Sequence, residues 1–255
     1  MVFWGVERYF WVAFCLLSLV WFNEFELQQN APVINQWFIF FSGLSAYTYL
    51  RLPVFFSGLK QKKLGFVPFL IFSSSVSFFL FLLLDRNAQI WSIIGVPFIL
   101  LYKIPTPYRV LGIKKIPFLK IFVIALVWSI WVVPVAFGLG FSNIFWTRPF
   151  VAMFCFCFAI TIPFDIRDID IDRKNKVKTI PHLIGIRASI FLSLLFIFLS
   201  LLLFDLDWDY RFVFMIFIFP IIALSGKRRK NAFYFSFCVE GLSFLLYCLK
   251  FIFSE

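Results

Sequence analysis

The chain has 255 residues, of which 62% are hydrophobic and 41 are Phe, and its formal net charge is +11. No soluble domain of this length is so apolar, because a surface in water must present groups that water solvates. The sequence therefore predicts an all-α, polytopic membrane protein whose single domain spans residues 1–255. Nucleic-acid binding is not expected despite the positive charge, because no platform of aromatic and basic residues lies outside the apolar segments.

Nine apolar segments, separated by charged residues or by Pro and Gly, are predicted to cross the membrane. The first has no small-residue cleavage site after it and is therefore expected to be a span rather than a signal peptide. The fourth and eighth are short and are expected to be tilted, half-inserted or extended by a flanking helix. In chain order, the segments are residues 8–22, 33–57, 64–84, 88–102, 117–140, 147–165, 182–204, 210–225 and 231–253.

The charges between these segments predict the orientation of the chain. With the N-terminus on the cytoplasmic side, the inner loops carry clusters of Lys and Arg, whereas the outer loops carry one such residue each or none. This alternation follows the positive-inside rule through all nine segments. We therefore expect an integral protein of the bacterial inner membrane, with the N-terminus and the basic loops in the cytoplasm. Carboxylates follow the opposite trend and fall mostly on the outer side.

The most highly charged stretch, residues 165–181, goes against this trend. Asp165, Asp168 and Asp172 are spaced i, i+3 and i+7, which places them on one face of a helix. Three carboxylates on one stripe repel one another unless a cation lies between them, and a divalent cation that prefers oxygen is the simplest such partner. Lys and Arg residues follow directly and suit phosphate oxygens. The stretch predicts a Mg²⁺–diphosphate site, and the alternative is a solvated loop of mixed charge.

Cations on other inner loops are candidates to complete this site. Arg51, near the inner end of the second segment, either faces an internal cavity or snorkels to the surface. The loop from Tyr102 to Lys115 contains two prolines that prevent a long helix, and its cations either cover a diphosphate or only set the topology. Glu240 is expected to face the bundle interior, and the five cysteines are interpreted as packing residues. The expected diphosphate-binding residues are Arg51, Lys103, Lys114, Lys174 and Lys178.

The charged stretch resembles the second aspartate-rich motif, DxxDxxxD, of the UbiA superfamily of intramembrane prenyltransferases. The similarity is greatest to the menaquinone-type members, because Asp165-Ile-Arg-Asp168 is followed by Lys178-Thr-Ile-Pro181. The loop from Tyr102 to Lys115 also resembles the connection between the fourth and fifth helices of the family. The resemblance implies a bundle of about nine transmembrane helices around a central cavity that opens to the inner face.

The resemblance also implies an activity. It is the transfer of a prenyl group from a prenyl diphosphate to an aromatic or other lipophilic acceptor, with Mg²⁺ as cofactor and a place in quinone biosynthesis. By the same resemblance, Asp165, Asp168 and Asp172 are the catalytic residues and the Mg²⁺ ligands. Lys178 and the cations of the 102–115 loop neutralise the charge of the leaving group.

One motif of the family is missing from this sequence. The first motif, NDxxDxxxD, belongs at the inner end of the second helix, but the chain has no Asp or Glu between Glu26 and Asp85. Either one metal acts with Arg51 or Lys60 in place of the other, or the protein is a degenerate relative that binds an isoprenoid lipid or a partner without transfer. A small transporter is a third hypothesis, disfavoured because no internal repeat is evident.

Overall fold

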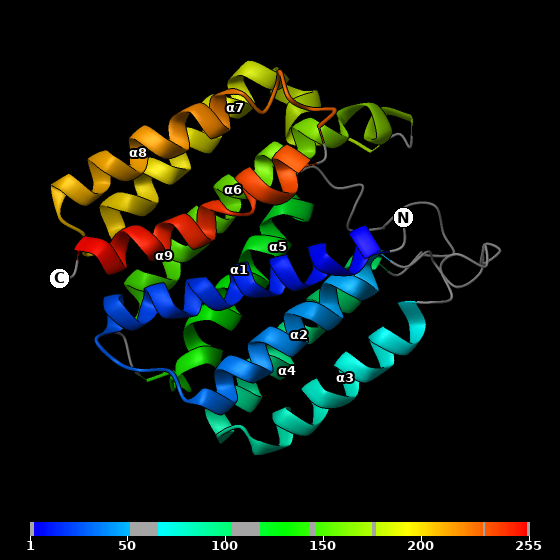
Figure 1. Cartoon of the computed structure of the whole chain (residues 1–255), viewed down its shortest axis with the longest axis vertical. Coiled ribbons are helices and arrows are strands. Elements are labelled where there is room, and N and C mark those ends of the chain that lie inside the picture. Colours follow the sequence, from blue (N-terminus) through cyan, green and yellow to red (C-terminus); the bar gives the residue numbers. More distant parts are fainter. Residues whose placement is uncertain are drawn as a thin grey trace.

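The computed structural model describes residues 3–51, 66–103, 118–142, 146–174, 177–231 and 233–253. Within these ranges the chain forms helices that run back and forth as one bundle (Figure 1). The α-helices are α1 (Phe3–Leu27), α2 (Val33–Arg51), α3 (Phe66–Leu83), α4 (Arg86–Lys103), α5 (Leu119–Ile130), α6 (Thr147–Lys174), α7 (Ile180–Leu203), α8 (Trp208–Ala223) and α9 (Leu242–Phe253). Two π-helical segments, η3 (Trp131–Val135) and η5 (Tyr234–Val239), extend α5 and precede α9.

Helix α1 packs against helices from both halves of the chain. Helix α1 packs against α2 on one side and against α9 on the other, while α5 and α6 pack together behind it (Figure 1). Helices α6 and α7 share the most extensive interface, and α7 and α8 form the far edge of the second half. The N-terminal and C-terminal helices are therefore neighbours.

Each of the nine predicted segments corresponds to a helix within the described residues. The short fourth and eighth segments are α4 and α8, which have 18 and 16 residues. Four helical stretches are long and apolar enough to cross a membrane by length and composition, and shorter apolar helices accompany them. The main difference in bounds is at the end of α6, which continues beyond the predicted end at residue 165 to Lys174 and therefore includes the acidic stretch.

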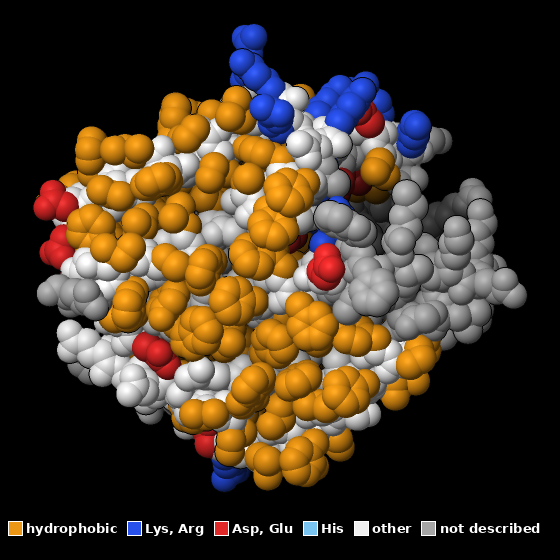
Figure 2. Space-filling model, in the orientation of Figure 1, with side chains coloured by type: hydrophobic (Ala, Val, Ile, Leu, Met, Phe, Trp, Pro, Cys, Tyr) orange, Lys and Arg blue, Asp and Glu red, His pale blue; other side chains and the backbone are white. Residues whose placement is uncertain are grey.

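The surface of the bundle is the reverse of that of a soluble protein. Large apolar side chains such as Phe78, Phe191 and Phe212 are exposed, while Phe22 and Phe156 are fully buried in the core. Figure 2 shows hydrophobic side chains over the middle of one face, with Lys and Arg gathered at one end and several Asp and Glu at the opposite end. This distribution fits a lipid-facing belt between two polar surfaces.

Several buried hydroxyls inside the helices bond to their own helix backbone. The hydroxyls of Ser92 and Ser129 each donate at 2.7 Å to the carbonyl four residues earlier, which removes an unpaired donor from an apolar environment. Glu240 is buried at the junction of η5 and α9, as the sequence predicts. The five cysteines are all free, and Cys15, Cys155 and Cys157 are buried, in agreement with a packing role.

Candidate functional site at the end of helix α6

Helix α6 carries the acidic stretch on its last turns. The helix ends with Arg173 and Lys174, and cations in the last turn are favoured there because the helix dipole is negative at its C-terminus. The spacing of Asp165, Asp168 and Asp172 is therefore realised on a helix, as predicted. Asp165 is the innermost of the three, with only 2% of its side chain exposed.

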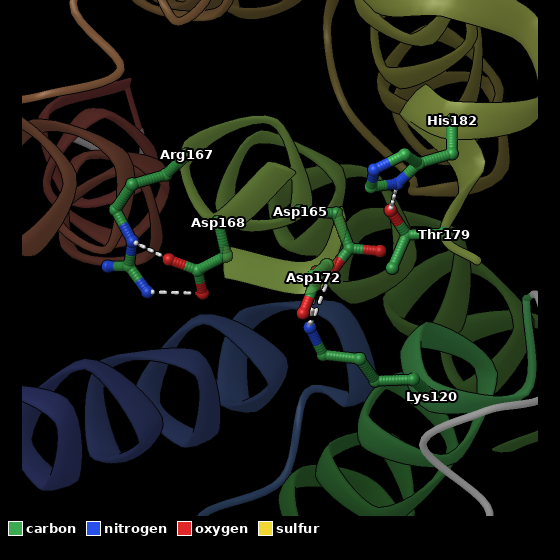
Figure 3. Close-up of polar contacts among 7 residues, drawn as sticks. All are labelled: Lys120, Asp165, Arg167, Asp168, Asp172, Thr179 and His182. Carbon is green, nitrogen blue, oxygen red and sulfur yellow. Dashed lines mark hydrogen bonds and ion pairs between the residues drawn. The ribbon is translucent and has the colours of Figure 1, made fainter. Parts of the chain in front are cut away.

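A lysine from a different helix lies between two of these carboxylates. The Nζ atom of Lys120, in the first turn of α5, is 2.7 Å from Oδ1 of Asp165 and 4.0 Å from Oδ2 of Asp172 (Figure 3). Its side chain is only 17% exposed. The sequence pattern required a cation between the carboxylates, and within the described residues that cation is an ammonium group.

Asp168 has a separate partner. Arg167 donates from Nε and Nη2 to the two carboxylate oxygens of Asp168, at 2.8 and 3.0 Å (Figure 3). The same guanidinium lies 5.0 Å from the ring centroid of Phe164 and 5.6 Å from that of Phe235. Because Phe235 belongs to η5, this stacking ties the end of α6 to the segment that precedes α9.

A more exposed ion pair and a polar contact lie beside the cluster. Asp170 is 59% exposed and its Oδ2 is 3.8 Å from Nη1 of Arg229, which belongs to the connection between α8 and η5. On the side of Asp165 away from Arg167, Thr179 Oγ1 lies 2.8 Å from Nδ1 of His182 (Figure 3). Helix α7 is interrupted just beyond, at Gly185, whose φ of +82° suits a residue without Cβ.

The predicted diphosphate-binding cations fall into two groups. Lys174 and Lys178 are exposed at the end of α6 and in the segment that follows it. Helices α2 and α4 end at Arg51 and Lys103, but these two side chains, together with all of Lys114, lie outside the described residues. The role of each of these five cations thus stays a prediction.

The sequence interpretation missed Lys120 as a site residue. The sequence does contain an indication that Lys120 is a site residue. It lies inside the fifth apolar segment, where a charged side chain needs a partner. Arg167 and Arg229 are not among the predicted site residues either, although each of them pairs with a carboxylate of the cluster.

The observed arrangement does not fit a pair of metal ions held by protein carboxylates. Within the part of the chain that the structure describes, no group of three or more His, Cys, Asp or Glu side chains converges as a metal cage. Oδ1 of Asp165 is bonded to Lys120, and both oxygens of Asp168 are bonded to Arg167. A divalent ion bound here would have to displace one of these cations or share the carboxylates with it.

An apolar groove of about 550 Å³ lies between α1 and the segment that contains η5. Its charged lining residues are Glu7 and Arg8, near the start of α1. The phenyl ring of Phe235 connects the groove with the end of α6, because it contacts Arg167 while its neighbours on η5 form one wall of the groove. The lining residues are Glu7, Arg8, Phe10, Trp11, Phe14, Phe233, Ser236 and Phe237.

Comparison with known proteins assigns the chain to a family. The sequence profile of the UbiA prenyltransferase family matches residues 50–231, which is more than half of the chain and includes the acidic end of α6. The protein belongs to the UbiA prenyltransferase family. A search among curated protein sequences finds no match.

Solved structures of UbiA homologues share the fold. The apo structure of a homologue from Aeropyrum pernix K1 superposes with a TM-score of 0.63 at 14% identity, over 98% of both chains. A homologue from Archaeoglobus fulgidus bound to GPP and Mg²⁺ has a TM-score of 0.59 at 14% identity, over 97% of this chain and 96% of that one. The same homologue bound to DMAPP and Mg²⁺ gives 0.57 at 15% identity, with the same coverage. The predicted UbiA-like helical bundle is thereby confirmed.

Proposed function

We propose that this UbiA-family protein binds a prenyl diphosphate at the inner end of α6 and transfers its prenyl group to a lipophilic acceptor. The observation that carries the proposal is the set of carboxylates and cations that α5 and α6 bring together, with Asp165 buried against Lys120. Support comes from a structural relative that was solved with GPP or DMAPP and Mg²⁺. An aromatic precursor of a membrane quinone is the acceptor class to test first.

The charges of the cluster suit the chemistry of a diphosphate leaving group. The C1–O bond of the prenyl diphosphate breaks with its electron pair going to the diphosphate, and an allylic cation remains. Lys120, Arg167 and the exposed Lys174 and Lys178 stabilise the negative charge that the leaving group gains. The acceptor then forms a bond to C1 and loses a proton. If Mg²⁺ is bound with the diphosphate, the carboxylates of Asp165, Asp168 and Asp172 would hold it, and it would neutralise part of the diphosphate charge.

The groove between α1 and η5 is the proposed place for the isoprenoid chain. Its walls are mostly aromatic and its volume of about 550 Å³ is within the range of small-molecule sites. The carboxylate end of α6 lies across η5 from it, joined through Arg167 and Phe235. We further propose that the whole chain is one domain and that the N-terminus and this end of α6 face the cytoplasm, because the Lys and Arg side chains of the described residues gather at this end.

Binding of GPP to the purified protein in detergent, with and without Mg²⁺, tests the proposed function. Wild type is expected to bind GPP in the presence of Mg²⁺, and Asp168→Asn is expected to lose most of that binding. Asp209→Asn, an exposed carboxylate at the start of α8, is the matched control and should bind like wild type. Failure of wild type to bind GPP would overturn the proposal.

A degenerate, non-catalytic relative is the second candidate. It is favoured by the ion pairing of the acidic residues and by the lack of any Asp or Glu between Glu26 and Asp85. The two candidates differ in turnover: release of diphosphate from GPP in the presence of membrane lipids and quinone precursors supports the enzyme. Tight GPP binding without release of diphosphate supports the binding protein.

A further inference from the structure

The acidic cluster is nearly neutralised by side chains of the protein itself. Asp165, Asp168, Asp170 and Asp172 each have a Lys or Arg nitrogen within 4.0 Å. Among the described residues these four carboxylates meet three cations, because Lys120 serves two of them. The cluster therefore has at most one net negative charge, and the Lys and Arg residues that follow α6 can only reduce it.

Lys120 lies where a bridging metal ion would lie. A Mg²⁺ ion bound to both Asp165 and Asp172 needs an oxygen of each at about 2.0–2.1 Å. The ammonium group already lies between these carboxylates, 2.7 Å from one and 4.0 Å from the other. Two divalent ions would require far more negative charge than the cluster offers.

The position of Lys120 on its own helix points to the same role. It lies in the first turn of α5, where the helix dipole disfavours a positive charge by roughly 0.3–1 kcal/mol. It is also mostly buried, which costs further free energy for an ammonium group. Neither the position in the first turn nor the burial of the ammonium group stabilises α5. The attraction to the carboxylates of α6 therefore explains why a lysine lies at this position.

We propose that Lys120 is a fixed cation that takes the place of one divalent metal ion, so that this protein binds a diphosphate with at most one such ion. The inference rests on the proposed function, because it concerns the same diphosphate site. It also accounts for an independent observation, the absence of any acidic residue between Glu26 and Asp85. A site with one built-in cation needs fewer carboxylates, and Lys120 supplies that charge among the described residues.

The ammonium group can serve carboxylate and substrate together. It has several N–H donors, so it can keep its bond to Asp165 while it donates to a phosphate oxygen. Its short bond to Asp165 holds it in place before the substrate arrives, which reduces the ordering required on binding.

The number of Mn²⁺ ions bound by the full-length protein at saturating GPP tests this inference. Free Mn²⁺ is measured by electron paramagnetic resonance in wild type, Lys120→Gln and Lys120→Arg. Wild type and Lys120→Arg should bind at most one ion per chain. Lys120→Gln, which keeps a hydrogen-bond donor but removes the charge, should bind one more ion or bind Mn²⁺ at least about tenfold more tightly. Lys227→Gln removes an exposed charge at the same end of the bundle and should behave like wild type.

The outcomes separate the inference from the proposed function. Two Mn²⁺ ions per GPP-bound wild-type chain would overturn the inference, even if no Lys120 variant folds. A folded Lys120→Gln variant whose Mn²⁺ binding equals that of wild type would overturn it as well. If wild type does not bind GPP, the proposed function fails, and the Mn²⁺ titration without GPP still compares wild type with Lys120→Gln.

Discussion

Carboxylates at the two ends of the bundle have different kinds of partner. At the predicted outer end, they accept hydrogen bonds from the backbone: Asp85 accepts from the N–H groups of Asn87 and Ala88 at 3.0 and 3.1 Å. Glu24 accepts from the N–H of Ala31 at 2.9 Å. These donors are neutral and fixed by the chain, so such carboxylates cap helices and close turns.

At the inner end of α6, the carboxylates face charged side chains instead. Lys120 and Arg167 hold Asp165 and Asp168 through rotatable groups that are themselves suited to phosphate. A backbone donor cannot leave its carboxylate without unfolding a turn, whereas a Lys or Arg side chain can turn toward a ligand. The comparison favours a structural role for the outer carboxylates and is consistent with the ligand-binding role proposed for the inner ones.

The largest effect is expected from Asp165→Ala. The substitution leaves the mostly buried ammonium of Lys120 without its partner at 2.7 Å. Loss of one partner of a buried ion pair costs about 3–5 kcal/mol of unfolding free energy, and GPP binding should also be lost. Unfolding by SDS titration in mixed micelles and calorimetric titration with GPP measure the two effects.

The double variant Lys120→Met/Asp165→Leu separates stability from ligand binding. Replacement of a buried ion pair by apolar side chains of similar volume is often neutral or stabilising. The double variant should therefore unfold within about 1 kcal/mol of wild type but should not bind GPP. A double variant that binds GPP as wild type does would show that this pair is structural, like the outer carboxylates.

A smaller effect is expected at the outer end from Asp85→Ala. The substitution removes the cap of α4 and should lower the unfolding free energy by about 1 kcal/mol, the usual loss for an N-cap. Asp85→Asn retains an acceptor and should lose much less. GPP affinity should be unchanged in both variants, and a loss of binding in either would break the proposed division between the two ends.

The helices could be predicted from sequence because each depends on a local run of apolar residues. One boundary was predicted wrongly, at the end of the sixth segment. Asp and Arg residues ended the predicted sixth segment at residue 165, yet α6 continues to Lys174 because its charges pair with one another and with neighbouring elements. Pro134 lies in the π-helical η3, since a residue without N–H cannot complete the ordinary hydrogen-bond ladder.

The candidate site could be predicted only in part. The i, i+3, i+7 spacing identified the three carboxylates on α6, because that information is contained in one helix. The partner of Asp165 could not be identified in the same way, since Lys120 lies 45 residues away and meets it only when α5 packs on α6. The residues that a sequence does not place are thus those whose role depends on the contact between helices.

The smallest effect is expected from Arg229→Gln. Its guanidinium is 3.8 Å from Asp170; Arg229 is 35% exposed and Asp170 is 59% exposed. Exposed pairs contribute little because water and salt screen them, so the change in unfolding free energy should be below about 0.5 kcal/mol. GPP affinity, measured at low and at physiological salt, should also be close to that of wild type. A clear loss of affinity at low salt that disappears at higher salt would extend the ligand-binding region to Arg229, because a long-range attraction between Arg229 and the diphosphate would be screened in this way.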